Sequence, residues 1–166
     1  MSPDYLLRAK SDLRVAKLVL GSDDDYDLLI AAYHVQQAVE KTLKLALKEL
    51  GVPYTKTRRI EDLLSRLPDN QNLLGEEWLD WLETNSATFC DWESKTCYVE
   101  GYSVTRRHVL RLYNDSVRLV AEFERTLQAL YEVSAREQPK RSLSHLDLGG
   151  GIQNDFLRVD HESIEF

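Results

Sequence analysis

The chain contains few of the residues that cross-link or interrupt a polypeptide. Its 166 residues include two cysteines, four prolines and seven glycines. The two thiols, Cys90 and Cys97, are too few for a disulfide framework and do not have Cys-x-x-Cys spacing, so we expect both to be reduced. With 43% apolar residues, the composition excludes a wholly disordered chain and is sufficient for one hydrophobic core.

Long apolar runs and a basic excess are also missing. No stretch approaches the roughly 20 apolar residues that a membrane span needs, and residues 1–4 have neither the basic start nor the apolar run of a signal peptide. We therefore expect a cytoplasmic protein that has no membrane partner. The net charge is −7, from 21 Lys+Arg and 28 Asp+Glu. Any nucleic acid would consequently have to bind at a local basic patch.

Apolar residues recur every three or four positions along most of the chain, which is typical of helices that bury one face. One series runs from Leu6 to Leu20, and another runs from Leu29 to Leu50, just before a glycine and a proline. No segment reads convincingly as a strand. The fold class is therefore all-α, an up-and-down bundle of about five helices. We predict helices at 3–20, 24–50, 58–67, 72–93 and 105–136.

The helical pattern ends near residue 136. Residues 137–166 contain three consecutive glycines and scattered apolar side chains. We predict one domain over residues 1–136 and a mostly irregular C-terminal extension over residues 137–166. Such an extension could dock on a partner chain or on its own bundle.

Aromatic residues are concentrated in the predicted helix 72–93. All three tryptophans of the chain fall there at helical offsets, which favours a core or a subunit interface over a ligand site. Because this helix is short for so much aromatic area, we expect part of that area to form a homodimer interface. The expected interface residues are Trp78, Trp81, Phe89 and Trp92.

The most distinctive segment runs from Tyr33 to Lys44 and reads YHVQQAVEKTLK. It resembles the second-helix signature of HEPN domains, the helical partners of minimal nucleotidyltransferases in prokaryotes. In that family a glycine ends this helix, as Gly51 is expected to do here, and a Val-Thr pair opens the last long helix, as at 104–105. The resemblance covers about residues 5–130.

Two other segments depart from the family pattern. The family has a Thr-His segment after the second helix, whereas this chain has Thr57 followed by Arg58. An Arg-Tyr-Pro turn often precedes the last helix, and here Cys97-Tyr98-Val99 lacks both the arginine and the proline. The resemblance implies a HEPN-like bundle that dimerises and pairs with a nucleotidyltransferase-fold protein, as in toxin–antitoxin-like pairs.

The residues of the signature can also be interpreted without the family. Gln36 falls on the apolar stripe, where a buried amide needs hydrogen-bond partners. Glu40 and Lys44 form an i,i+4 pair in the favourable order. One reading is a polar layer that fixes the register of the helices, next to a solvated charged face. The other is the polar floor of a groove that receives a nucleotide or an RNA phosphate.

The acid–base pair of HEPN ribonucleases is not found. Those enzymes have an arginine, then four to six residues, then a histidine. Arg107 directly precedes His108, His34 has no arginine nearby upstream, and His145 and His161 follow arginines by too few residues. We therefore lean towards a non-catalytic protein. The histidines also lack metal-ligand spacing, so no metal and no cofactor are expected.

Two basic clusters remain as candidates for an anion site. Lys56, Arg58 and Arg59 lie where a loop opens the third predicted helix, and Arg106, Arg107 and Arg111 lie in the first turns of the fifth. A solvated face, or salt bridges to the surplus acids, is the more ordinary explanation of both clusters. If the clusters converge, tyrosines nearby could stack on a base. The candidate nucleotide- or RNA-binding residues are Tyr33, His34, Gln37, Lys41, Lys44, Arg58, Arg59, Tyr98, Tyr102, Arg106 and Arg107.

Three functions follow for testing. The first is a non-catalytic helical module that dimerises, binds nucleotide or RNA weakly and pairs with a nucleotidyltransferase-fold protein. The second is a ribonuclease toxin that uses non-standard residues such as His34 or His108. The third is a structural bundle that only mediates protein contacts.

Overall fold

The computed structural model describes residues 3–54, 56–71 and 73–137. In this part of the chain every regular element is a helix, which confirms the predicted all-α bundle. The extension predicted for 137–166 lies outside the described residues except for Glu137. The helices are α1 (Pro3–Val19), α2 (Asp25–Glu49), α3 (Ile60–Leu64), α4 (Glu76–Lys95) and α5 (Arg106–Glu137).

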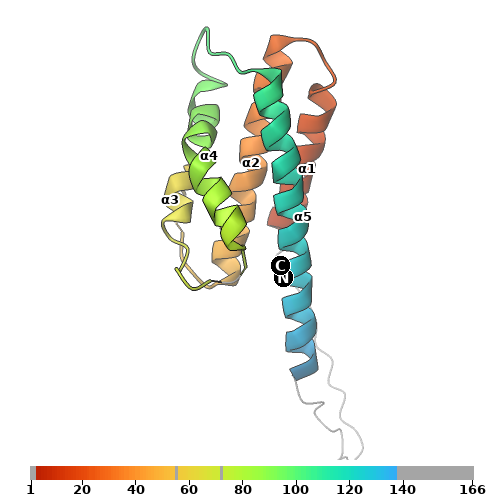
Figure 1. Cartoon of the computed structure of the whole chain (residues 1–166), viewed down its shortest axis with the longest axis vertical. Coiled ribbons are helices and arrows are strands. Elements are labelled where there is room, and N and C mark those ends of the chain that lie inside the picture. Colours follow the sequence, from red (N-terminus) through yellow and green to blue (C-terminus); the bar gives the residue numbers. More distant parts are fainter. Residues whose placement is uncertain (1–2, 55, 72, 138–166) are drawn as a thin grey trace, which may run out of the picture.

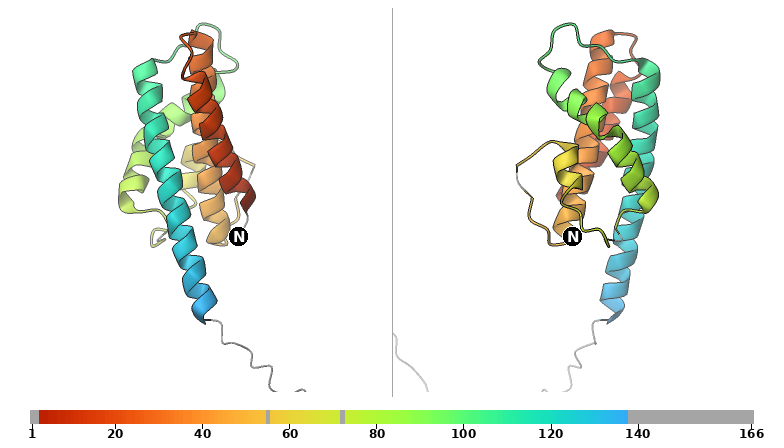
Figure 2. Two further views of the ribbon diagram at one scale, coloured as in Figure 1. Left: turned by 90° about the vertical axis from the view of Figure 1, so that its right-hand side faces the viewer. Right: turned by 60° about the vertical axis from the view of Figure 1, so that its left-hand side comes forward.

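Helix α2 is the centre of the bundle. It contacts all four other helices, and α1 and α5 run beside it along most of its length (Figure 1). Helices α3 and α4 pack together on the other side of α2, and the end of α5 extends past the rest of the bundle (Figures 1 and 2). None of the helices in the described ranges is both long and apolar enough to cross a membrane.

The long α2 has clear signals at both ends. The carboxylate of its N-cap, Asp24, accepts a hydrogen bond from the Tyr26 backbone N–H at 2.7 Å. At the other end Gly51 has a φ of 67°, a left-handed conformation that glycine adopts without strain. Between these ends, small side chains bring α1 close: Ala9 and Ala16 on α1 and Ala31 and Ala38 on α2 are all fully buried.

The third helix is shorter than predicted. Residues 58–67 were expected to be helical, but α3 covers only Ile60–Leu64. The hydroxyl of Thr57 accepts a hydrogen bond from the Arg59 backbone N–H and donates one to Asp62, which fixes an extended turn ahead of the helix. Local side-chain bonds thus replace the first helical turn, and Arg58 and Arg59 lie in a loop.

The aromatic residues of α4, which were expected at a subunit interface, lie largely inside the chain. Trp78, Phe89 and Trp92 are buried within this single chain, and Trp81 is half-buried. The four rings pack edge to face in sequence, with centroids 5.6–5.8 Å apart. Because the aromatic area of α4 is used inside the chain, these residues no longer support a dimer interface.

Candidate functional site

The residues of the second-helix signature form a polar network with α1. Asp12 on α1 bridges two residues of α2: its carboxylate lies 3.0 Å from Nδ1 of His34 and 2.6 Å from Nζ of Lys41. The side chains of these three residues are 15–26% exposed, so the network lies at the edge of the α1–α2 contact. Lys41 also donates to the Gln37 amide oxygen at 3.2 Å.

A second part of the network crosses α2 to the loop before α3. One carboxylate oxygen of Glu40 accepts from the amides of Gln36 and Gln37 at 3.2 and 3.1 Å, and the other accepts from Lys44 at 2.7 Å. Gln36 is fully buried and also donates to the backbone carbonyl of Arg58 at 3.2 Å. The signature therefore holds the 56–59 loop on α2, as expected of a buried polar layer.

This network neutralises both lysines that were candidates for phosphate binding. Lys41 is paired with Asp12, and Lys44 is paired with Glu40, whose side chain is 6% exposed. A phosphate would have to compete with these short ion pairs. The polar layer predicted from the sequence is present, and the positive charge of its two lysines is already matched.

Arg58 differs from the two lysines. Among the described residues, no carboxylate or carbonyl accepts a hydrogen bond from its guanidinium, and the residue is exposed. Burial raises the pKa of the nearby Tyr33 phenol, and the charge of Arg58 acts in the opposite direction on that pKa. The Tyr98 phenol also acts on the Tyr33 pKa, and Tyr98 is 83% exposed. The Tyr33 ring packs edge to face on the ring of His34, with centroids 5.7 Å apart.

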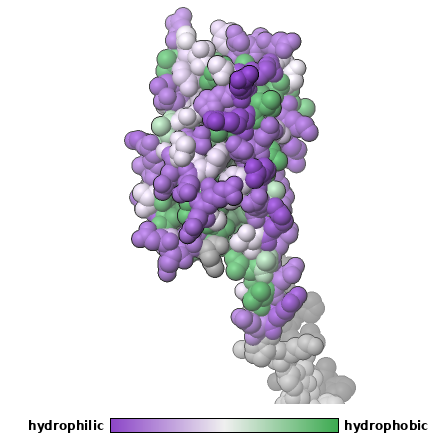
Figure 3. Space-filling view, in the orientation of Figure 1, coloured by the Kyte–Doolittle hydropathy of each residue, from purple (hydrophilic) through white to green (hydrophobic). Residues whose placement is uncertain are grey.

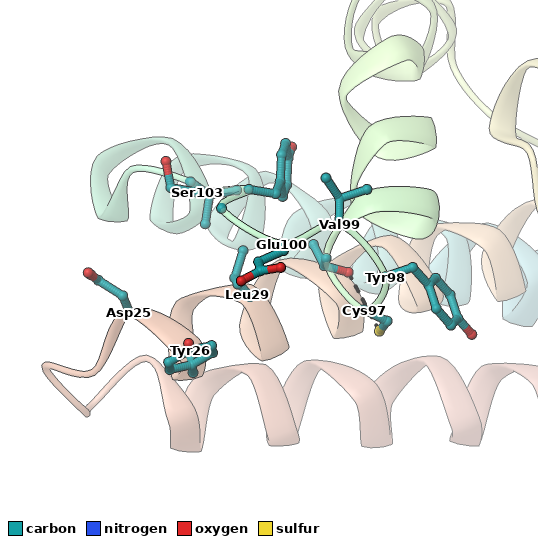
Figure 4. Close-up of a pocket in the computed structure, with 12 residues that line it drawn as sticks. Asp25, Tyr26, Leu29, Cys97, Tyr98, Val99, Glu100 and Ser103 are labelled. Atoms are coloured by element: carbon teal, nitrogen blue, oxygen red, sulfur yellow. Dashed lines mark hydrogen bonds between the residues drawn. The ribbon is translucent and has the colours of Figure 1, made fainter.

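A separate cleft lies between the start of α2 and the loop that joins α4 to α5 (Figure 4). It has a volume of about 810 Å³, and Tyr98 and Tyr102 are among its lining residues. Asp25 and Glu100 supply its charged groups, and no lysine or arginine lines it. In Figure 4, Asp25 and Tyr98 lie at opposite ends of this cleft. Its acidic lining does not suit a phosphate.

The two arginines that begin the basic cluster of α5 have different surroundings. Arg106 donates hydrogen bonds to the backbone carbonyls of Leu20, at 2.6 Å, and Ser22. It therefore holds the turn between α1 and α2 against α5, which is a structural role. Arg107 is exposed on α5. The other predicted cluster is also partly used, because Arg59 pairs with Glu61 at 3.0 Å.

The histidines occupy different environments. The ring of His108 packs edge to face on Trp92, with centroids 5.8 Å apart. Burial, and next the charge of Arg111, lower the pKa of His108, so the ring is neutral near pH 7. His34 is the histidine that is held by a carboxylate. His145 and His161 lie outside the described residues.

Sequence reasoning missed one member of the site. Asp12 was not a candidate, although it joins His34 to Lys41. Asp12 lies four residues before the buried Ala16 on an amphipathic helix, and no sequence pattern distinguishes it from other surface aspartates. Only the packing of α1 on α2 brings Asp12 to His34. No group of three or more His, Cys, Asp or Glu side chains in the described ranges is placed to hold a metal ion.

The comparisons with known proteins give the family. A family model described as HEPN domain matches residues 2–126. The chain therefore belongs to the HEPN family, which confirms the resemblance found in the segment from Tyr33 to Lys44. Neither the curated proteins nor the solved structures contain a match to this chain.

Proposed function

We propose that this HEPN-family chain is a non-catalytic binding module that binds a nucleotide or a short RNA weakly. The support is the neutralisation of Lys41 and Lys44 by Asp12 and Glu40, whereas Arg58, in the loop that Gln36 contacts, forms no ion pair with another described residue. The charge of Arg58 acts to lower the pKa of the Tyr33 phenol, and Tyr33 and the exposed Tyr98 offer aromatic rings for stacking. One phosphate contact and one or two stacked bases give binding that is weak and tolerant of sequence.

The same geometry offers little for cutting RNA by the family's usual acid–base pair. His108 is neutral and packed on Trp92. Arg106, two residues before it on α5, is bonded to backbone carbonyls. Proton transfer and phosphate stabilisation need a histidine and an arginine that face one substrate atom. These two side chains are held in other contacts.

Replacement of Arg58 by alanine tests the binding site. We expect Arg58→Ala to weaken binding of a short single-stranded RNA and to reduce the slope of log K against log salt by about 0.7, the value for one phosphate on a single strand. Arg66→Ala is the matched control, because Arg66 is also an exposed arginine near α3. Equal binding by the two variants, or no binding of RNA at low salt, would refute this site.

Pairing with a nucleotidyltransferase-fold protein and formation of a homodimer belong to the same proposal. Both rest on membership of the HEPN family. Co-purification from the native host, followed by mass spectrometry, tests the pairing and shows whether a nucleotide accompanies the protein. Recovery of the chain without any protein of that fold contradicts the pairing.

A second candidate function is a ribonuclease that uses His34. The observation in its favour is the contact of Asp12 with Nδ1 of His34 at 3.0 Å, because a carboxylate that orients one ring nitrogen leaves Nε2 to move a proton. Degradation of RNA by homogeneous protein, lost in His34→Ala and reduced in Asp12→Asn, would establish this function. Persistence of the degradation in His34→Ala would assign it to a contaminant.

A further inference from the structure

A groove separates α1 from α5, the two helices that stand at the front of the left view in Figure 2. Its volume is about 280 Å³. The floor is apolar and includes Leu13 on α1 with Val117, Val120 and Ala121 on α5. Val117 is 38% exposed, so the floor is open to an occupant that can bury it. Nothing in the binding site proposed above uses this groove.

The rim of the groove is basic, although the whole chain is acidic. Lys10, Arg14 and Lys17 line it from α1, and the carboxylate at its edge, Glu124, is paired with Lys10 at 2.5 Å. Arg14 and Lys17 are exposed and form no ion pair with another described residue. An apolar floor beside two unmatched cations fits an occupant that carries both apolar and acidic side chains.

We propose that residues 152–166 of the same chain bind in this groove. That segment has the complementary composition, with four acids and one arginine. Its sequence interleaves these acids with apolar residues, namely Ile152, Phe156, Leu157, Val159, Ile164 and Phe166. The apolar side chains match the floor, and the acids match Arg14 and Lys17.

The length of the intervening chain allows this contact. Helix α5 ends at Glu137, twenty residues after Val117, which is about 30 Å at 1.5 Å per residue. Residues 138–151 provide fourteen residues that span up to about 46 Å when extended. The segment can therefore return along α5 to the groove without help from a second copy.

Other occupants fit less well. A nucleic acid would satisfy Arg14 and Lys17 but would place phosphates against Leu13 and Val117. A second copy of the chain, or another acidic protein, would have to compete with a segment that is covalently attached. Because a short linker attaches residues 152–166 to α5, their effective concentration at the groove is in the millimolar range.

Disulfide trapping in the full chain tests the proposal. In a background that carries Cys90→Ala and Cys97→Ser, one variant adds Val117→Cys and Leu157→Cys. The control replaces Leu130 instead of Val117. Leu130 is also 38% exposed and on α5, but it lies thirteen residues nearer to the segment along the chain. Apolar side chains are also exposed near the end of α5, where that helix extends past the bundle (Figures 1 and 3).

If the segment binds in the groove, the intramolecular disulfide should form about tenfold faster in the Val117→Cys variant than in the Leu130→Cys variant. Binding would hold the Leu157→Cys thiol close to the groove and so raise its effective concentration near position 117. Adding Arg14→Glu and Lys17→Glu removes that preference. An equal or faster rate at Leu130→Cys overturns the proposal. A disulfide-linked dimer, seen when two tagged forms are mixed, also overturns it in favour of a second copy.

A measurement without introduced cysteines guards against misfolded variants. Phe156→Ser with Leu157→Ser should lower the midpoint of thermal unfolding by about 2–4 °C. The two serine substitutions should not lower the midpoint further in a protein that already carries Arg14→Glu and Lys17→Glu, because the segment and the groove stabilise the fold through one shared contact. Additive or absent effects contradict binding in this groove.

Discussion

At the scale of single residues, Asp12 joins two side chains of the signature segment, His34 and Lys41, to α1. Its carboxylate, only 15% exposed, lies 3.0 Å from Nδ1 of His34 and forms an ion pair with Lys41. Its side chain therefore joins α1 to α2 at the point where α2 carries its most distinctive residues. Removing one partner from such a pair leaves the others poorly solvated, which costs more than the pair itself contributes.

Replacement of Asp12 measures this effect. We expect Asp12→Ala to lower the free energy of unfolding by about 1–3 kcal/mol, since Lys41 loses its partner at a half-buried position. Asp4→Ala is the control, because Asp4 and Arg8 form an ion pair whose side chains are 64% and 63% exposed. Denaturant unfolding should give a change of about 0–1 kcal/mol for the control. Similar losses in both variants would contradict the role of Asp12.

His108 gives a prediction about pH. Burial lowers its pKa below 6.5, so the unfolded chain takes up a proton at this residue before the folded chain does. The folded state consequently loses stability as the pH falls from about 6.5 towards the lowered pKa. His108→Phe keeps a ring on Trp92 but cannot titrate. Thermal unfolding over this pH range should show a flatter profile for His108→Phe, and a profile as steep as that of the unchanged chain would show that other groups are responsible.

At the scale of the elements, the start of α5 secures the turn between α1 and α2. Arg106 reaches two backbone carbonyls there, at Leu20 and Ser22, and lies 3.6 Å from the Asp23 carboxylate. Carbonyls after the end of a helix lack intrahelical partners, so a cation that bonds them completes the C-terminus of α1. The contact joins segments more than eighty residues apart.

Neighbouring arginines on α5 allow a matched test of this contact. Arg106→Ala should lower the free energy of unfolding by about 1–3 kcal/mol, the range for charged hydrogen bonds. Arg107→Ala should change it by no more than about 0.5 kcal/mol, because Arg107 is exposed and has no such contacts with described residues. The same two proteins also separate structure from binding: a loss of RNA affinity in Arg107→Ala alone would place the second basic cluster in the binding surface.

At the scale of the whole molecule, local sequence signals predict the long helices, whereas contacts between distant segments are not predicted. The apolar spacing in α2 and α5 predicted both helices to within one or two residues, since their ends carry local signals such as Gly51. The short α3 and the position of Asp12 depend on contacts with other segments, which leave no periodic signal. The tryptophans of α4 were predicted as core or interface, and burial against α5 decides for the core, with Trp78 donating to Glu122 at 2.6 Å.

The dimer prediction therefore needs a different surface. Exposed apolar side chains border the cleft between α2 and the α4–α5 loop, where Tyr26 and Val99 are 78% and 49% exposed. If the chain dimerises through this end, Tyr26→Glu with Val99→Glu should give monomers, because burying unpaired charges opposes association. Leu7→Glu, a change at a 60% exposed residue near the start of α1, should leave the dimer intact.

Sedimentation equilibrium at about 10–50 μM, where an interface of micromolar affinity is populated, distinguishes these outcomes. A monomer in the unchanged chain would remove the dimer from the proposed function, and a dimer unaffected by the Tyr26 and Val99 changes would place the interface on another face.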